Sequence, residues 1–387
     1  MKKITFLLSL LLITSVMFSQ SECNVFCPVI SPDGNTIYFS SDRDGGVYEI
    51  YKIDINGQSN LIRLTTSGED NKLYPAISPD GTLLAFQQGD YGASSEIYTM
   101  NTDGSNLFRL TNNSIYDGTP NFSPDGQNIV FSAWDDYEYP EIFVMTREGL
   151  GRTQLTNNTG AYWQSSPIYN PSGTKIYFMA GLNADDHLVM MDTDGQNWVN
   201  ITPDDNSFGD SEFLPRFNAD GTKMLFQTTK VLGYNNGSNI VLADPDGSNW
   251  VQITASSNGA WYYYAYFHPT NDKIYFVYMH TSSSTYKLYR MNQDGTDMEL
   301  IIDCKTLGLD DNRISQKRVI YPNPAEGVVN VDVEGKFTIE IVDLTGKIIL
   351  TSNERITDIS QLPVGIYMAI IRDAHNQIIT SEKLSKL

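Results

Sequence analysis

Hydrophobic residues recur along most of the chain in short alternating stretches, and the stretches themselves repeat. In each repeat an apolar residue is followed two positions later by phenylalanine, and residues two apart lie on the same face of a β-strand. The phenylalanines are Phe39, Phe86, Phe131, Phe178, Phe226 and Phe276, and the apolar residues before them are Ile37, Leu84, Ile129, Ile176, Met224 and Ile274. We expect each pair to pack between neighbouring units of the fold.

A four-residue turn precedes each of these strands. It reads SPDG at Ser31–Gly34, Ser78–Gly81 and Ser123–Gly126, and then NPSG at Asn170–Gly173, NADG at Asn218–Gly221 and HPTN at His268–Asn271. The copies begin 45 to 50 residues apart, a period that indicates a solenoid or a propeller.

Each unit continues with a third strand, such as EIYKI from Glu49, a second glycine turn, and a fourth strand that leads into Leu-Thr or Ile-Thr, as at Leu64 and Thr65. Four short strands and two turns in six copies predict an all-β fold, a six-bladed β-propeller over residues 23–304. The SPDG turn, the Ile-x-Phe strand and the EIY strand resemble the repeats of TolB-type β-propellers. That resemblance implies the fold but no activity, because propellers have many functions.

The pattern changes after the repeats. Residues 305–318 are polar and read as a linker, and residues 319–387 alternate in short strands typical of a small C-terminal β-sandwich. The characteristic residues of this segment, in chain order, are Tyr321, Pro322, Asn323 and Pro324, then Asp343, Gly346 and Lys347, then Gly365, Tyr367 and Lys383. Together they closely resemble the type A sorting domain of the type IX secretion system of Bacteroidetes. An accessory binding module of similar fold is the alternative.

The sorting-domain resemblance implies that the type IX secretion machinery is a partner through residues 319–387, and that the protein is secreted or attached to the outer-membrane cell surface. Residues 1–20 carry Lys2 and Lys3 before an apolar run, which predicts a signal peptide for export to the periplasm. A buried helix is the alternative for this run. A lipoprotein anchor is disfavoured because Glu22 precedes Cys23, and no later segment predicts a transmembrane helix.

The chain has three cysteines, Cys23, Cys27 and Cys304. When the units are aligned, Cys23 and Cys304 fall at positions that lie three residues apart in an ordinary junction between units. We therefore predict a Cys23–Cys304 disulfide that closes the ring, with about 4–5 kcal/mol of stabilisation in the chain-entropy model. Two free thiols are the alternative. Cys27 falls on an innermost strand and is expected to be a small buried hydrophobe.

The net charge and the absence of known catalytic or metal-binding sequence motifs exclude several classes of function. The formal net charge of −20 repels phosphate backbones, so we expect no nucleic-acid partner. The four histidines are scattered, and the sequence has no nucleophile elbow, zinc motif or phosphate loop, so we assign no catalytic residue, metal or cofactor. Asp192-x-Asp194-Gly195 has the start of a calcium loop, but its form is typical of a hairpin turn.

Antiparallel strands place the long, unequal loops on one face, and variable loops on a rigid scaffold commonly carry binding sites. The ligand-binding candidates on that face are Trp134, Asp135, Asp136, Tyr137, Tyr139, Tyr162 and Trp163. Residues 261–267 read WYYYAYF. We expect these rings mainly to fill the interfaces between blades, with a part in binding as the alternative.

These features predict a secreted or cell-surface propeller that binds a protein or a glycan through its long-loop face. The alternative is a glycan-active enzyme, a lyase or hydrolase that uses carboxylates at the mouth of the propeller channel. A periplasmic role in envelope integrity, like that of TolB, is disfavoured by the sorting tail.

Overall fold

The computed structural model describes residues 23–44, 46–57, 60–66, 70–89, 95–113, 115–134, 139–157, 163–182, 185–202, 212–229, 237–254, 259–283, 285–303, 320–321, 327–331, 333, 335–343, 347–373 and 378–386. Throughout these ranges the regular elements are strands, and no helix occurs. The chain divides into two compact units, Met1–Leu309 and Asp310–Leu387.

The first unit contains six four-stranded antiparallel sheets among its described residues, and each sheet is one blade. The innermost strands are β1 (Val25–Ile30), β5 (Lys72–Ile77), β9 (Asp117–Phe122), β13 (Gln164–Tyr169), β17 (Glu212–Phe217) and β21 (Ala260–Phe267). The second strands are β2 (Thr36–Ser41), β6 (Leu83–Gln88), β10 (Asn128–Ala133), β14 (Lys175–Leu182), β18 (Met224–Thr228) and β22 (Lys273–His280).

The outer half of each blade is built from a third strand and a short fourth strand. The third strands are β3 (Glu49–Asp54), β7 (Glu96–Asn101), β11 (Glu141–Thr146), β15 (Asp185–Asp192), β19 (Asn239–Ala243) and β23 (Lys287–Asn292). The fourth strands are β4 (Ile62–Arg63), β8 (Phe108–Arg109), β12 (Thr153–Gln154), β16 (Val199–Asn200), β20 (Val251–Gln252) and β24 (Glu299–Ile302).

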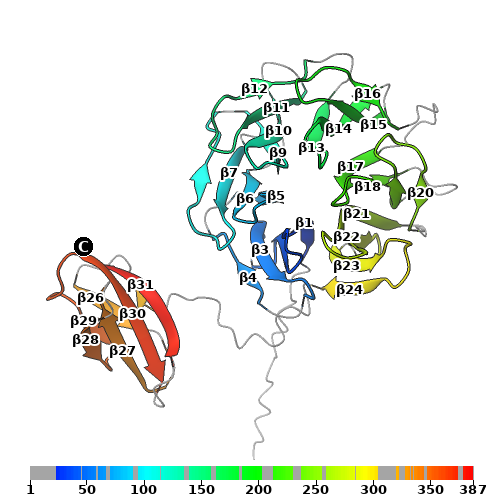
Figure 1. The fold of residues 1–387 in the computed structure, drawn as a ribbon. Coiled ribbons are helices and arrows are strands. Elements are labelled where there is room, and N and C mark those ends of the chain that lie inside the picture. The colour runs from blue at the N-terminus through cyan, green and yellow to red at the C-terminus, as the bar shows by residue number, and fades with distance from the viewer. Residues whose placement is uncertain are drawn as a thin grey trace, which may run out of the picture. The chain divides into compact units, whose positions relative to one another are not determined.

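The blades form a closed ring, as Figure 1 shows. Within each sheet the strands follow chain order from the inside outward, and each inner strand contacts the next inner strand around the ring. β1 contacts β21, so the first blade meets the last. The predicted all-β propeller is therefore confirmed.

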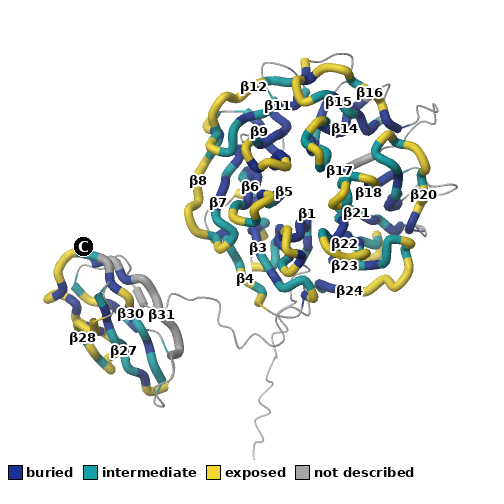
Figure 2. The backbone as a smooth tube through the Cα atoms, in the orientation of Figure 1, coloured by how far each residue is buried: buried dark blue, intermediate teal, exposed yellow. Residues whose placement is uncertain are grey.

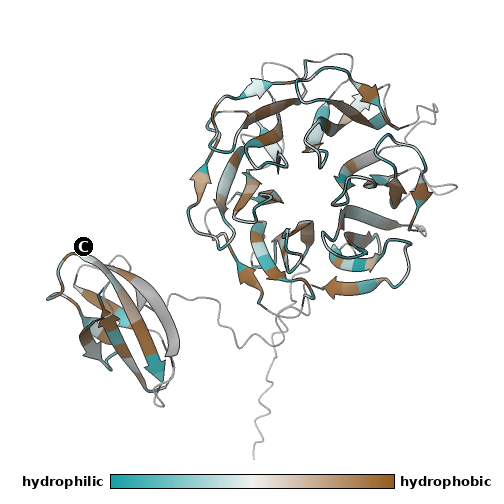
Figure 3. Cartoon of the chain, viewed as in Figure 1, coloured by the Kyte–Doolittle hydropathy of each residue, from teal (hydrophilic) through white to brown (hydrophobic). Residues whose placement is uncertain are grey.

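The repeated apolar pairs fill the spaces between blades, as expected. Ile37 and Phe39 are fully buried and pack with Tyr275 and Val277 of the last blade in one cluster. In Figures 2 and 3 the buried and hydrophobic residues of the ring gather in its strands, whereas the turns and most of the outermost strands are exposed. Burial of these side chains is the main driving force for assembly of the ring.

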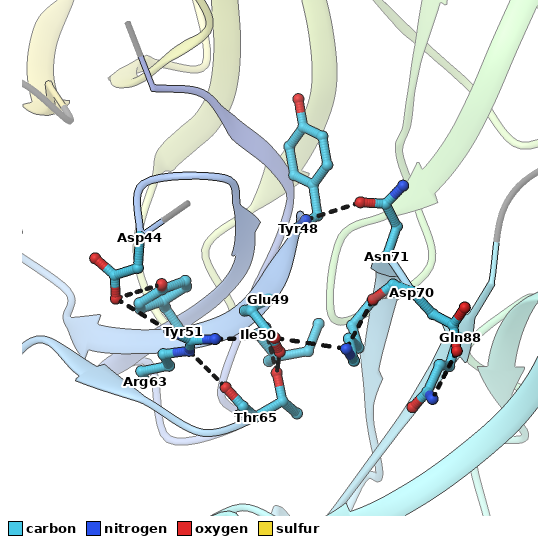
Figure 4. A network of polar contacts seen from close by, with 11 residues as sticks. Asp44, Tyr48, Glu49, Ile50, Tyr51, Arg63, Thr65, Asp70, Asn71 and Gln88 are labelled. Carbon is cyan, nitrogen blue, oxygen red and sulfur yellow. Dashed lines mark hydrogen bonds and ion pairs between the residues drawn. The ribbon is translucent and has the colours of Figure 1, made fainter. Parts of the chain in front are cut away.

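The threonine after the fourth strand fastens that strand to the third. In the first blade the Thr65 hydroxyl accepts the backbone N–H of Ile50 at 2.9 Å and donates to the carboxylate of Glu49 (Figure 4). Arg63 donates to the same carboxylate at 2.9 Å, and Lys72 of the next blade lies 3.5 Å from it. The repeated Glu and Thr therefore support contacts within the blade and between blades.

Among the described strands none is exchanged between the first and last blades, so these blades meet through side-by-side contacts. Within the described ranges, the backbone N–H of Val25 donates to the Tyr286 carbonyl at 3.0 Å, and the His268 ring lies 3.0 Å from the Gly34 carbonyl oxygen. Cys23 is disulfide-bonded and Cys27 is a free, buried thiol. Cys304 lies outside the described residues, so its pairing with Cys23 stays a prediction.

The second unit is a small two-sheet β-structure. Its described strands are β25 (Ile320–Tyr321), β26 (Val328–Val331), β27 (Phe337–Val342), β28 (Ile348–Ser352), β29 (Ile356–Asp358), β30 (Gly365–Asp373) and β31 (Ile378–Lys386). One sheet has the order β25-β26-β29 and the other β28-β27-β30-β31. A shared core that includes Val329, Ile339 and Leu384 joins them, which confirms the β-sandwich.

Several predicted motif residues of this unit hold its turns. The backbone N–H of Asp343 donates to the Lys347 carbonyl at 3.0 Å, and the buried Tyr367 donates its hydroxyl to the Pro363 carbonyl at 2.8 Å. Gly365 begins β30, Tyr321 ends β25, and Lys383 belongs to β31. Outside the described residues lie Pro322, Asn323, Pro324 and Gly346, together with the predicted signal peptide and the predicted linker.

Candidate functional site

Each innermost strand is interrupted by a bulge in which one non-glycine residue adopts a left-handed backbone conformation. These residues, with their φ angles, are Cys27 (47°), Tyr74 (53°), Thr119 (49°), Ser166 (55°), Leu214 (56°) and Tyr264 (51°). Proline follows five of them. A residue before proline ordinarily favours extended backbone, so the ring imposes a locally strained conformation, and such strain is often found at binding sites. All six line the narrow part of a central channel.

The channel widens on one side of this ring into a cavity of about 470 Å³. Six aromatic residues line it: Tyr74, Tyr116, Trp163, Trp261, Tyr263 and Tyr264. Tyr116 and Trp163 directly precede inner strands, and Thr229 directly follows a second strand, so the cavity lies at the face that carries the long loops. None of the described residues that line the cavity is Asp or Glu.

The aromatic run of the last blade has two roles. Trp261 and Tyr263 stack with their ring centroids 5.8 Å apart and 5° between the planes, and both line the cavity. Tyr262 and Phe267 point the other way and belong to the core between blades. The left-handed bulge at Tyr264 breaks the alternation, so adjacent tyrosines line the cavity. The run therefore fills the interface, as expected, and also builds the cavity.

A buried amide adds a polar group to the cavity wall. Gln227, on β18, is only 5% exposed, and its side-chain oxygen is buried without a hydrogen-bond partner among the described residues. The equivalent Gln87 accepts a hydrogen bond from the Tyr116 hydroxyl at 3.4 Å. Buried polar groups are nearly always hydrogen-bonded in native proteins. Gln227 therefore has a spare acceptor at this wall, and its buried amide must turn toward the cavity before a ligand can use it.

The residues predicted from the loops divide into three sets. Trp163 lines the cavity, packed against Gly181, where a Cβ atom would lie 2.6 Å from the indole nitrogen. Trp134 and Tyr139 are not among the lining residues, although the ring centroid of Trp134 lies 5.8 Å from that of Tyr116, which does line the cavity. Asp135, Asp136, Tyr137 and Tyr162 lie outside the described residues.

Sequence reasoning missed Tyr74, Tyr116 and Gln227. One signal was available for Tyr74, because the repeated proline marks the residue before it in every blade but the last, and those residues all line the channel. Within the described ranges, no group of three His, Cys, Asp or Glu side chains lies close enough together to hold a metal ion. The buried His187 lies 3.3 Å from the Thr202 hydroxyl.

Comparison with known proteins identifies both units. Residues 72–261 match the model of the TolB β-propeller domain, and residues 319–385 match that of the secretion system C-terminal sorting domain. The chain therefore contains a TolB-type β-propeller and a type IX secretion sorting domain, which indicates an exported protein with a secreted or cell-surface location. No curated protein matches the chain.

Solved structures support the fold. TolB from Acinetobacter baumannii is similar with a TM-score of 0.56 and 20% identity, over 73% of this chain and 64% of that one. A putative TolB from Agrobacterium tumefaciens is similar with a TM-score of 0.50 and 23% identity, over 59% of this chain and 80% of that one. An oligogalacturonate lyase in complex with manganese is similar with a TM-score of 0.50 and 18% identity, over 72% of this chain and 77% of that one. At these identities the similarity shows the fold alone. No described helix of this chain is long and apolar enough to span a membrane.

Proposed function

We propose that this protein is an exported binding protein whose propeller cavity receives the end of a glycan. The observation that carries the proposal is the aromatic cavity of about 470 Å³ with the unpartnered oxygen of Gln227 in its wall. Cavities of about 300–1,000 Å³ with mostly apolar walls and a few fixed polar groups are typical small-ligand sites. Sugar rings have apolar faces that stack on aromatic rings and hydroxyls that can donate to an amide oxygen.

A protein partner would be expected to use a broader surface, since specific protein interfaces bury about 800 Å² on each partner. The concave shape of the site favours a chain end over a flat surface. The enzyme alternative needs a pair of carboxylates at the mouth of the channel. The described cavity wall offers none, and the predicted candidates Asp135 and Asp136 lie outside the described residues. These points support binding ahead of turnover.

An array of host, plant and microbial glycans, probed with the mature chain, tests the proposal. We expect selective binding to a small group of glycans that share a terminal unit. A blank array would reject the glycan proposal and favour a protein partner at the same face, to be sought by pull-down from the cell surface. Disappearance of the bound glycan with the release of products would favour the enzyme alternative.

The sorting tail leads to a prediction about export. We propose that the signal peptide carries the chain to the periplasm and that residues 319–387 then direct it across the outer membrane. Deleting residues 319–387 is expected to trap the propeller in the periplasm, which cell fractionation and immunoblotting would detect. The matched control is Asp358→Ala, a change at an exposed position of the same unit, which should leave export intact. Normal surface display of the deleted chain would contradict the assignment.

A further inference from the structure

The ring of left-handed residues encloses a narrow chamber of about 20 Å³ next to the cavity. Tyr74, Thr119, Ser166, Leu214 and Tyr264 line both spaces, so the two lie side by side. A water molecule needs about 10–15 Å³ measured in this way. The chamber therefore admits a group about the size of a single oxygen, while the wide cavity holds the bulk of a ligand.

The only charged residue among the described walls of the two spaces is Arg216. It lies on β17 just after the bulge at Leu214, and its guanidinium carbon is 4.6 Å from the centroid of the Tyr266 ring. One terminal nitrogen donates to the Pro215 carbonyl at 2.7 Å. The Nε atom is buried and has no hydrogen-bond partner among the described residues, and no ion pair of the described chain includes this arginine.

The neighbours of Arg216 do not neutralise its charge. Burial raises the pKa of the Cys27 thiol to about 12, and the positive charge of Arg216 is one of the smaller effects that lower it. Burial also raises the pKa of the Tyr266 phenol, and Arg216 again acts in the opposite direction. Both groups are therefore neutral at pH 7, and no carboxylate of the described residues is among the groups that shift either pKa. A partly buried cation without a counter-charge is costly, and an anionic ligand group would relieve that cost.

We propose that Arg216 binds a carboxylate at the end of the ligand, so that the cavity selects an acidic saccharide over its neutral counterpart. This inference rests on the proposed function. An arginine forms strong charge-assisted hydrogen bonds with a carboxylate through its planar donors. The size of the chamber lets an oxygen of the acid group reach the arginine, while the sugar ring stays among the aromatic residues. The chain as a whole carries a charge of −20, so away from this local cation an acidic ligand meets a repulsive net charge.

The test is isothermal titration of the mature chain with a matched pair of probes: a uronic-acid-terminated oligosaccharide and the same oligosaccharide after reduction of its carboxyl group to an alcohol. The wild type is expected to bind the acid roughly tenfold or more tightly than the reduced form. Arg216→Gln should abolish that preference, because it weakens binding of the acid far more than binding of the reduced form. Arg216→Lys, which keeps the charge, should retain part of the preference.

Arg147→Gln is the matched control, because Arg147 is a partly buried arginine near the Gly126 turn whose ion pair to Asp80 is unrelated to the channel. It should leave the preference intact. Equal binding of both probes by the wild type, or a preference that survives Arg216→Gln, would overturn the inference and leave the proposed function standing. Binding of neither probe by the folded wild type, together with a blank glycan array, would overturn both.

Discussion

Replacing Gly247 with alanine is expected to lower the free energy of unfolding of the propeller by about 2–5 kcal/mol. Gly247 lies in the turn between the third and fourth strands with a φ of +82°, a conformation that costs an alanine about 1–2 kcal/mol. A Cβ atom there would also overlap the backbone carbonyl of Ile201 in the preceding blade. Backbone cannot move aside as a flexible side chain can, so the clash adds to the strain.

The equivalent glycine of every blade also lies close to a backbone carbonyl of the preceding blade, which explains why a glycine occupies this turn in each unit. The described partners are carbonyl groups of the preceding blade: Ile301 for Gly57, Leu64 for Gly104, Leu110 for Gly149, Leu155 for Gly195, and Ile253 for Gly295. The glycine is thus a requirement of packing between blades as well as of the turn itself.

Gly221→Ala is the matched control. Gly221 has a similar φ of +70°, but its nearest neighbour would be Pro171 at 3.4 Å, an ordinary contact. This variant should lose only about 1–2 kcal/mol. Urea denaturation followed by tryptophan fluorescence measures the unfolding free energy of both variants, because all five tryptophans belong to the propeller unit. Equal losses for the two variants would contradict the proposed role of the contact between blades.

Breaking the disulfide at Cys23 is expected to cost the propeller about 2–5 kcal/mol of unfolding free energy. Among the described residues the ring closes without strand exchange, so the first and last blades are joined by packing and by isolated bonds such as that between Val25 and Tyr286. The predicted Cys23–Cys304 disulfide would add a covalent link between them. Cys23→Ser should shift the urea midpoint downward. Wild-type protein treated with a reductant should shift by the same amount.

Cys27→Ala controls for loss of a cysteine, because Cys27 is free and buried in the channel. This variant should keep the full response to reductant. Non-reducing peptide mapping should detect the peptides that contain Cys23 and Cys304 as one disulfide-linked species. Recovery of both cysteines as free thiols, or a urea midpoint that reductant leaves unchanged, would contradict the predicted Cys23–Cys304 disulfide.

Much of the fold could be predicted from the sequence because its signals are repeated and local. Phe39 and its equivalents alternate with period two, the glycine turns recur at fixed positions, and each copy reinforces the others. The sorting domain was predictable for a similar reason, since several motifs occur in a fixed order over residues 319–387. These features depend on backbone geometry and burial, which leave a periodic pattern in the sequence.

The site was harder to predict because its residues come from different blades and share no common chemistry. The channel position before the repeated proline is Tyr74 in one blade, Ser166 in another and Leu214 in a third. Its left-handed conformation opposes the local preference of a residue before proline and arises from the closed ring. For Trp134 the sequence suggested a binding residue from its loop position alone; its ring contacts that of Tyr116, and its role in binding stays a prediction.

The central claim is that the ligand occupies the aromatic cavity, and titration of the best array glycan against Trp163→Ala tests it most directly. Loss of this lining ring is expected to weaken binding by about 2 kcal/mol, or roughly thirtyfold, as for other buried aromatic hot spots. Trp198→Ala is the control, because Trp198 is a half-buried indole whose nitrogen donates to the Gly195 carbonyl at the second glycine turn. We expect a large loss for Trp163→Ala and wild-type affinity for Trp198→Ala. Wild-type affinity in a correctly folded Trp163→Ala protein would contradict it.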